Sequence, residues 1–154
     1  MKEIINKRAY FDYEITEKFQ AGVVLIGQEV KSIKTGRINL AGSYVVPKQA
    51  QPGKQPEFYL IGANIPPYQP KNAPSSYNPN RSRQLLLRKE EIKRLIGKTG
   101  QKGLTLVPIR IYTINGKIKL EFGIGKGKRK ADKREAIKKR DTKREIEKAL
   151  KTRG

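Results

Sequence analysis

The last 29 residues, 126–154, place the strongest limit on how this 154-residue chain folds, because they cannot help to build a core. They carry 14 Lys or Arg against 5 Asp or Glu, and their bulky apolar residues are Ile137, Ile146 and Leu150. Pairs such as Glu135 and Lys139, four residues apart, favour a helix that has no apolar face to dock. A polyanion that neutralises and orders the segment is its natural partner; a solvated basic tail or a localisation patch is the alternative.

Residues 1–125 are expected to fold as one domain, with 126–154 as an appendage. This body also carries a net charge of +12, which favours an extended polyanionic surface over a small acidic ligand. The chain has no Cys and no His, which excludes disulfides, the usual zinc sites and His-based acid–base catalysis. No apolar run has the length of a membrane span and no signal-peptide pattern opens the chain, so we expect a cytoplasmic protein with no membrane partner and no cofactor.

The first third of the chain predicts two strands and a helix. Residues 13–16 alternate apolar and polar side chains and residues 23–26 are all apolar, so both are typical of strands. Gly22 between them permits a bulge or a sharp bend. Residues 29–35 favour a short helix, and Gly36 suits its C-terminal cap.

The middle of the chain predicts a strand pair and a long irregular segment. Residues 43–47 and 58–63 favour strands, joined by an exposed Gln/Pro/Gly-rich loop at 49–56. Residues 64–83 contain five prolines. Their length and composition are consistent with a disordered linker or with a functional surface loop.

The remaining body predicts a helix and a hairpin. Ile92, Leu95 and Ile96 share one face of a helix expected over 88–96, with Gly97 as its stop. Runs of alternating residues flank Asn115-Gly116, the strongest short hairpin signal in the chain. Six or so short strands with two helices indicate a small, mostly β body, and a barrel would remove the strand edges that would otherwise be exposed.

The chain offers little for catalysis. Asp12 and Glu14 would share one face of a strand, while the adjacent Glu90 and Glu91 would not share a face of a helix, and charged residues at such places are mostly solvated. Residues 123–128 (GIGKGK) lack the spacing of a nucleotide-binding fingerprint and favour a flexible joint between body and tail.

RNA binding accounts for the composition better. Tyr10, Phe11 and Tyr13 are interleaved with Lys7 and Arg8, so phosphate contacts and base stacking could come from one segment. On a strand, one face of these aromatic residues would instead fill the core. Membrane binding by the basic tail would need a broad apolar face, which it does not have.

Motifs along nearly the whole chain resemble the tmRNA-binding SmpB family, also called SsrA-binding proteins. The most specific is residues 21–33 (AGVVLIGQEVKSI), preceded by Asn6-Lys7-Arg8-Ala9 with Tyr13 and Ile15. Further similar motifs are Gly42-Ser43-Tyr44, Ala63-Asn64-Ile65, Asn78-Pro79 with Arg81 and Arg83, residues 85–87 before Glu91-Ile92, residues 103–108 with Tyr112, Lys126-Gly127-Lys128 and Asp132-Lys133-Arg134.

The resemblance implies an OB-type β-barrel with short flanking helices and a basic tail that becomes helical on binding. It implies an RNA partner and no DNA: the tRNA-like domain of tmRNA, delivered as alanyl-tmRNA with elongation factor Tu to stalled ribosomes. The tail would enter the vacant mRNA channel and order against small-subunit rRNA, which is the ribosome-rescue reaction called trans-translation. The family is not an enzyme family.

By motif position the resemblance assigns RNA-binding roles to twelve residues: Gln20, Gly22, Glu29, Lys31, Leu86, Lys119, Lys126, Gly127, Lys128, Asp132, Lys133 and Arg134. Alternation independently places Lys119 on the solvent side of its strand, between apolar Ile118 and Leu120. Two positions depart from the family pattern: Gln20 stands where many relatives have Glu, and Ala131 where many have Tyr or His.

Two other functions fit parts of the pattern. A small-subunit ribosomal protein, or another general RNA-binding protein, would share the basic body and tail but would not match residues 21–33. A nuclease would need a carboxylate cluster around a metal, for which Asp12 and Glu14 alone are too few.

Overall fold

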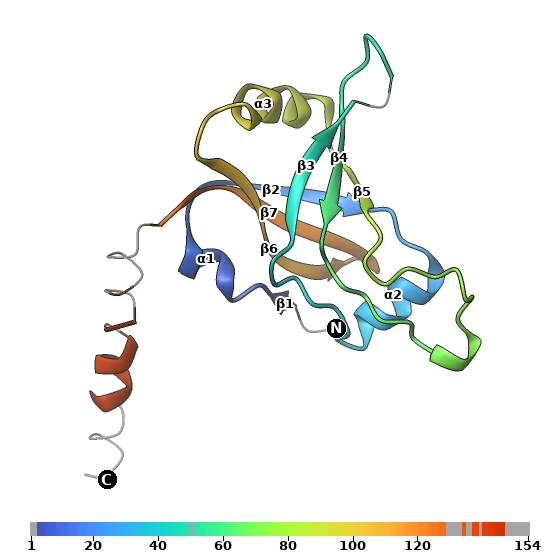
Figure 1. Cartoon of the computed structure of the whole chain (residues 1–154), viewed down its shortest axis with the longest axis horizontal. Helices are drawn as coiled ribbons and strands as arrows, with labels where there is room; N and C mark the ends of the chain where they lie inside the picture. The colour runs from blue at the N-terminus through green and yellow to red at the C-terminus, as the bar shows by residue number, and fades with distance from the viewer. Residues whose placement is uncertain (1–2, 50, 129–133, 135–136, 139, 147–154) are drawn as a thin grey trace.

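The computed structural model describes residues 3–49, 51–128, 134, 137, 138 and 140–146 (Figure 1). Its strands are β1 Ile4–Ile5, β2 Tyr13–Val23, β3 Tyr44–Lys48, β4 Glu57–Ile61, β5 Arg83–Leu86, β6 Leu104–Ile114 and β7 Lys117–Gly127. Its helices are α1 Arg8–Asp12, α2 Gly27–Lys34 and α3 Lys89–Thr99, with a short 3-10 helix at Pro70–Asn72.

The strands form a sheet that closes on itself. Neighbouring strands follow the order β6, β3, β4, β5, β2, β7, and β7 then pairs with β6, while β1 adds to β6 outside this ring. The mostly β body is therefore confirmed, and its strands close as a barrel. Closure matters because the edges of these short strands are paired with one another instead of exposed.

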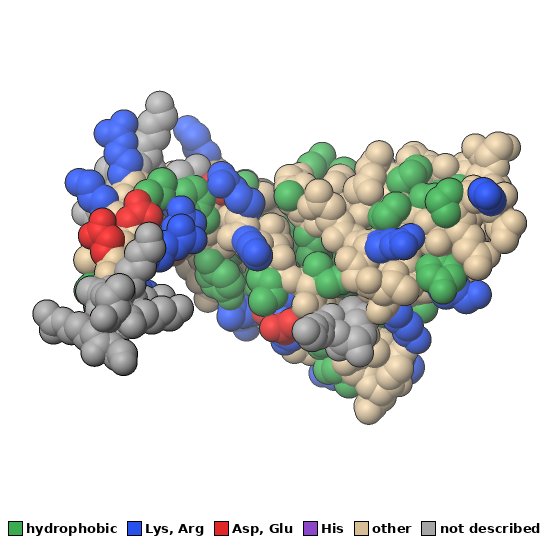
Figure 2. Space-filling model, turned by 90° about the horizontal axis from the view of Figure 1, so that it is seen from below, with side chains coloured by type: hydrophobic (Ala, Val, Ile, Leu, Met, Phe, Trp, Pro, Cys, Tyr) green, Lys and Arg blue, Asp and Glu red, His purple; other side chains and the backbone are tan. Residues whose placement is uncertain are grey.

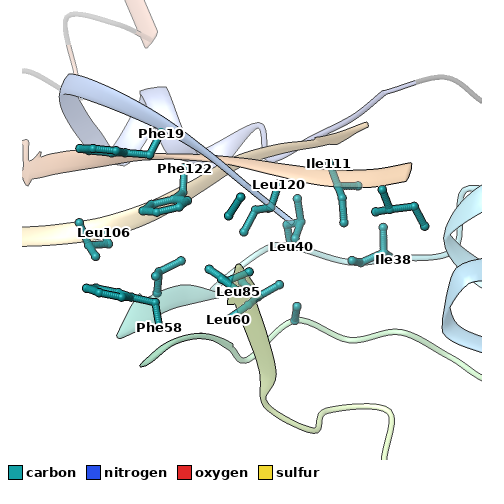
Figure 3. Close-up of a cluster of buried hydrophobic side chains, with 14 of the residues drawn as sticks. Phe19, Ile38, Leu40, Phe58, Leu60, Leu85, Leu106, Ile111, Leu120 and Phe122 are labelled. Carbon is teal, nitrogen blue, oxygen red and sulfur yellow. The ribbon is translucent and has the colours of Figure 1, made fainter. Parts of the chain in front are cut away.

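Alternate residues of the strands point inward and build the main core (Figure 3). On the other face of β6, Val107 and Ile109 pack with Ala9 of α1 in a second, smaller cluster. The rings of Phe19 on β2 and Phe122 on β7 stack with their centres 5.7 Å apart. Phe58, Leu60 and Leu120 are at most 1% exposed. Where no helix covers the sheet, the opposite side chains of the strands face outward and a ligand can reach them.

The β6–β7 hairpin is confirmed. Asn115 and Gly116 have φ angles of 50° and 76°, the left-handed pair that a tight hairpin turn requires. The strand after the turn, β7, continues to Gly127. The interpretation of residues 123–128 as a flexible joint was therefore wrong: most of them are strand.

Gly123 and Gly125 are there because β2 and β6 pack closely on β7. A Cβ on Gly123 would lie 2.6 Å from Ile15 Cγ2 and 2.8 Å from the Glu17 carbonyl oxygen. A Cβ on Gly125 would lie 3.0 Å from Tyr13 Cβ. At Gly123 such contacts leave no room for a side chain, and at Gly125 the neighbouring side chains would have to shift to admit one, so close packing favours glycine at both positions.

We expect Gly123→Ala to destabilise the barrel by about 1–3 kcal/mol, because the Glu17 backbone cannot rotate away from the added methyl group. Urea unfolding followed by circular dichroism measures this change. Gly127→Ala is the matched control, since no atom lies within 4 Å of a Cβ built there. Equal stability of the two variants would contradict the packing explanation.

The N-terminal segment differs from the prediction in three respects. Tyr10 and Phe11 lie in helix α1 and not in a strand. The strand expected over 23–26 ends at Val23, because the chain turns there into α2. The irregularity expected at Gly22 lies between Ile15 and Glu17, where the register of β2 against β7 shifts.

The two other helices are close to their predicted positions. Helix α2 begins two residues earlier than expected and is followed by Gly36 with a φ angle of 85°, as a C-terminal glycine requires. Helix α3 continues through Gly97 and ends at Thr99, with Gly100 as its cap. Leu95 is fully buried, whereas Ile96 is 44% exposed and does not share the buried face.

The described residues of the C-terminal segment, Arg134, 137, 138 and 140–146, are helical and exposed. Figure 1 shows residues 140–146 in a rod that stands clear of the barrel. Among the residues that the structure describes, no helix has the length and apolarity needed to cross a membrane.

Candidate nucleic-acid interface

Four of the predicted RNA-binding residues lie together on the outside of the barrel. Gly22 on β2 is the register partner of both Lys119 on β7 and Leu86 on β5. Gln20 points to the same side of β2, two residues before Gly22. An open groove of about 550 Å³ lies here, lined by Lys18, Phe19, Gln20, Leu86, Leu87, Arg88, Glu91 and Lys119.

Strand alternation explains why these side chains face solvent. Ile118 and Leu120 are buried, and Lys119 between them points outward, as predicted. Leu86 is 57% exposed although it is a large apolar residue. A Cβ on Gly22 would lie 3.5 Å from Leu86 Cβ and 3.7 Å from Lys119 Nζ, so this glycine leaves a flat floor between the two side chains.

The groove is predominantly cationic. Lys18, Arg88 and Lys119 line it, and the acidic side chain in its lining, Glu91, accepts a hydrogen bond from the Arg88 backbone N–H at 3.1 Å. Lys18 also lies over the ring of Tyr10, with Nζ 5.4 Å from the ring centre. A basic groove with an exposed leucine and a nearby aromatic ring suits a ligand that has both phosphates and flat bases.

Sequence reasoning missed Lys18 and Arg88 as members of this groove. Lys18 could have been found by alternation, because it lies two residues before Gln20 on the same side of β2. Arg88 had no such signal: it becomes part of the groove because α3 begins directly after it, at Lys89.

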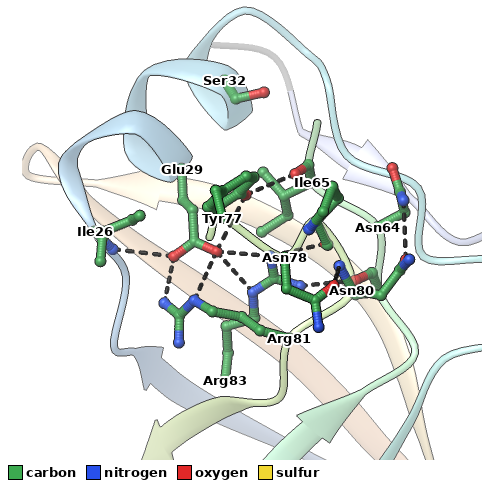
Figure 4. Close-up of polar contacts among 12 residues, drawn as sticks. Ile26, Glu29, Ser32, Asn64, Ile65, Tyr77, Asn78, Asn80, Arg81 and Arg83 are labelled. Atoms are coloured by element: carbon green, nitrogen blue, oxygen red, sulfur yellow. Dashed lines mark hydrogen bonds and ion pairs between the residues drawn. The ribbon is translucent and has the colours of Figure 1, made fainter. Parts of the chain in front are cut away.

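Glu29 is not part of the solvent-facing set, which corrects its predicted role as an RNA contact. Its side chain is 0% exposed. One carboxylate oxygen accepts the backbone N–H of Ile26 at 3.0 Å, at the start of α2, and also pairs with Arg81. The other accepts hydrogen bonds from Arg83 at 2.6 and 2.9 Å and from Arg81 at 3.1 Å (Figure 4).

This buried ion pair organises the proline-rich segment 64–83. Arg83 is also fully buried and donates to the carbonyl oxygens of Ala63 at 2.7 Å and Pro79 at 2.9 Å. Tyr77 donates to the carbonyl oxygen of Ile65 at 2.7 Å, and Ser32 on α2 donates to that of Pro66 at 2.7 Å. Segment 64–83 is therefore packed against the body, which excludes the disordered linker of the two alternatives from the sequence.

The Glu29 carboxylate is held in its charged form. Burial alone would raise the pKa of Glu29, but hydrogen bonds from Arg81, the Ile26 N–H and Arg83 outweigh burial and lower the pKa below its ordinary value. Removing either side of this pair would leave an uncompensated charge inside the protein.

The other predicted RNA-binding residues lie outside the groove. Lys31 is exposed on α2, with its Nζ 6.0 Å from the centre of the Tyr68 ring. Lys126, Gly127 and Arg134 are exposed. Asp132 and Lys133 lie outside the described residues.

Lys128 has a defined place at the end of the barrel. Its backbone N–H donates to the Asp12 carbonyl oxygen at 2.9 Å, and its Nζ donates to the Tyr10 carbonyl oxygen at 2.7 Å. Both acceptors belong to the last turn of α1, where carbonyl groups lack helical partners. The body therefore extends to Lys128, past the boundary predicted after residue 125.

The candidate acidic pair Asp12 and Glu14 is not arranged as predicted. Asp12 lies in α1 and pairs with Arg8 at 3.0 Å, so it does not share a strand face with Glu14. Among the described residues, no group of three or more His, Cys, Asp or Glu is arranged to hold a metal ion.

Cationic side chains also extend well beyond the groove. Between Glu29 and Glu90 the sequence has one acidic residue, Glu57. On the face shown in Figure 2, Lys and Arg side chains are spread along both the barrel and the helical C-terminal residues. This distribution matches an extended polyanion better than a compact ligand.

Comparison with known proteins gives a consistent result. The family model described as SmpB protein matches residues 3–152. The SsrA-binding protein of Sulfurihydrogenibium sp. (strain YO3AOP1) is 49% identical, with 95% of this chain and 91% of that protein covered. The SsrA-binding protein of Carboxydothermus hydrogenoformans is 48% identical, with 99% of both chains covered.

A solved structure described as "tmRNA-SmpB: a journey to the center of the bacterial ribosome" contains a chain that is 41% identical. Its TM-score is 0.65, and the match covers 88% of this chain and 94% of that one. Sequence, family model and fold thus agree over nearly the whole length, and the chain belongs to the SmpB family.

Proposed function

We propose that this protein binds tmRNA and acts in trans-translation at the ribosome. Membership of the SmpB family supports the role. One structural observation supports it further: Gln20, Leu86 and Lys119, chosen from sequence motifs alone, line one basic groove, and Gly22 lies between Leu86 and Lys119. A protein with this role acts in the cytoplasm, and the role needs RNA binding but no catalysis.

The groove would hold the tRNA-like domain through three kinds of contact. Lys119, Lys18 and Arg88 would pair with phosphates, and the exposed Leu86 would pack on a sugar or base above the Gly22 floor. Gln20 would donate or accept a hydrogen bond where a charged Glu would only accept one. The closed six-strand barrel that presents these residues supports the OB-type architecture implied by the motifs.

The protein would use its two modules in succession. The barrel would bind the tRNA-like domain and accompany alanyl-tmRNA with elongation factor Tu to the stalled ribosome. The C-terminal tail would then enter the mRNA channel, where a helix over 132–152 would extend roughly 30 Å. An occupying message, itself a polyanion, would exclude the tail, so the tail would sense that the channel is empty.

We expect binding to the tRNA-like domain to weaken steeply as salt rises, because a strongly basic body must release counterions from the RNA. Filter binding across a salt series measures the slope. Unrelated duplex RNA of equal length is the control and should bind more weakly at moderate salt. A flat salt response, or equal affinity for both RNAs, would contradict the proposal.

We expect Lys119→Ala to weaken tmRNA binding by about 1–3 kcal/mol, the cost of one charge-assisted phosphate contact, without changing the unfolding midpoint. Lys102→Ala, an exposed lysine outside the groove lining, is the matched control and should bind like the parent protein. A lowered midpoint would show that Lys119 is structural. Unchanged affinity would remove it from the interface.

A small-subunit ribosomal protein would also bind RNA through a basic body. Sequencing the RNA that copurifies with the full-length protein separates the two roles. A tmRNA-sized species supports the proposal, whereas intact small subunits without tmRNA would contradict it.

A further inference from the structure

The outer face of β3 and β4 carries aromatic and apolar side chains that the groove does not include. Val45 on β3 is buried, so Tyr44 and Val46 on either side of it point outward. Their register partners on β4, Ile61 and Tyr59, point the same way. Tyr44 is 43% exposed, and Val46, Tyr59 and Ile61 are partly exposed.

Two lysines, Lys48 and Lys54, belong to the β3–β4 hairpin that carries these rings. Lys48 Nζ lies 5.7 Å from the centre of the Tyr59 ring. Glu57, the acidic residue of these two strands, accepts a hydrogen bond from the Tyr59 hydroxyl at 2.6 Å, and this bond raises the pKa of Tyr59. In the described part of the chain, no ion pair joins Lys48 or Lys54 to a carboxylate.

The connecting loop carries a second lysine, Lys54. The Gln49 side chain donates to the carbonyl oxygens of Gln51 and Lys54, both at 2.7 Å. These two bonds hold the ends of the turn together. Lys54 therefore lies at the tip of the β3–β4 hairpin, at one end of the row of outward residues.

The aromatic face is continuous with the groove. Gln84 on β5 is the register partner of Tyr59, and Leu86, two residues further along β5, lines the groove. At the other edge, Tyr44 and Val46 line a small, mostly apolar groove of about 160 Å³, with Lys98 of α3 at its border. A ligand leaving the main groove across β5 would meet Tyr59 first and Tyr44 next.

We propose that the outer face of β3 and β4 is a second RNA-contacting surface, on which bases of a single-stranded segment stack on Tyr59 and Tyr44 while Lys48 and Lys54 pair with its phosphates. Exposed aromatic rings together with lysines that are in no ion pair are the elements that hold single-stranded nucleic acid without reading its sequence. Duplex RNA would not suit this surface, because its bases already stack on each other. The proposal does not depend on which RNA occupies the groove.

The test is fluorescence anisotropy with the full-length protein and a labelled oligoadenylate of about a dozen nucleotides, at salt high enough to weaken purely electrostatic binding. The double variant Tyr44→Leu/Tyr59→Leu keeps the apolar volume and the net charge, so the contribution of the basic tail stays constant. We expect its affinity to fall about 10-fold or more, the size of one or two lost stacking contacts.

Two controls make the result specific. Tyr59→Phe keeps the ring and should bind like the parent protein. Tyr68→Leu removes a ring that also lies beside a lysine, Lys31, but on α2's side of the molecule, and should have little effect. Unchanged affinity of the double variant, or an equal loss in Tyr68→Leu, would overturn the proposal, and the face would then be a candidate for a protein partner.

Discussion

Glu29→Ala should destabilise the protein by about 3–5 kcal/mol, the usual cost of removing one partner of a buried ion pair. Arg83 is fully buried and would be left with no carboxylate opposite it. The cap of α2 at Ile26 would be lost at the same time. Urea unfolding followed by circular dichroism measures the loss, and segment 64–83 should become the first site of limited proteolysis.

Glu14→Ala is the matched control, because Glu14 is an exposed glutamate on β2 and its loss should change stability by less than about 0.5 kcal/mol.

The stability that Glu29 contributes should decrease as the pH falls. Because the pKa of Glu29 is lowered from its ordinary value of 4.5, its stabilising contribution is complete above that pH and is lost as the pH falls through the folded-state pKa. The parent protein and Glu29→Ala should therefore converge in stability under acid conditions; a constant difference down to low pH would contradict the ion-pair explanation.

Truncation after Lys128 should abolish ribosome rescue while leaving the barrel folded and tmRNA binding largely intact. The cut follows Lys128, whose hydrogen bonds to α1 are kept, so it removes no described part of the core. The groove residues all remain. A rescue assay on a message without a stop codon, run beside tmRNA binding on the same protein, measures both activities.

A pair of point variants separates helix formation from charge in the tail. Lys143 lies among the described helical residues and is exposed. Lys143→Pro should break the helix at a cost of about 3 kcal/mol, whereas Lys143→Ala removes the same charge and keeps the helix. We expect rescue to fail in Lys143→Pro and to persist in Lys143→Ala.

For the truncation after Lys128, full rescue would refute a role for the tail. Loss of tmRNA binding by the truncated protein would mean that the barrel and the tail are not separable modules.

Local patterns predicted the parts of the fold that local chemistry controls. The hairpin at Asn115-Gly116 and the end of α2 at Gly36 depend on backbone with positive φ angles. Asn and Gly are the residues that adopt such angles most readily, so both features can be recognised from the sequence. The strand pair β3 and β4 followed from alternation and from a loop of Gln, Pro and Gly. The same alternation correctly placed Lys119 on the outside of β7.

The errors arose where distant segments meet. In the sequence, Gly123 and Gly125 resemble a flexible linker. The structure shows that they are strand residues packed closely against β2. Glu29 looks like a charged surface residue of a helix. Its burial depends on Arg81 and Arg83, more than 50 residues away, and no local pattern links those positions. The family motifs named Gln20, Leu86 and Lys119 of the groove, but not Lys18, Arg88 or the geometry that brings these residues together.

If the tail enters the mRNA channel as proposed, the anchoring of Lys128 on the last turn of α1 affects how quickly it can do so. A chain attached through a loose glycine joint would explore a large volume, and most of its orientations would be unproductive. Here the point of attachment is fixed by two hydrogen bonds, at 2.9 and 2.7 Å. Part of the configurational entropy of the tail is therefore already lost when the barrel folds, which leaves a smaller loss for the moment of insertion. Substitutions in α1, far from any tail residue in the sequence, should on this basis alter the speed of accommodation more than the affinity for RNA.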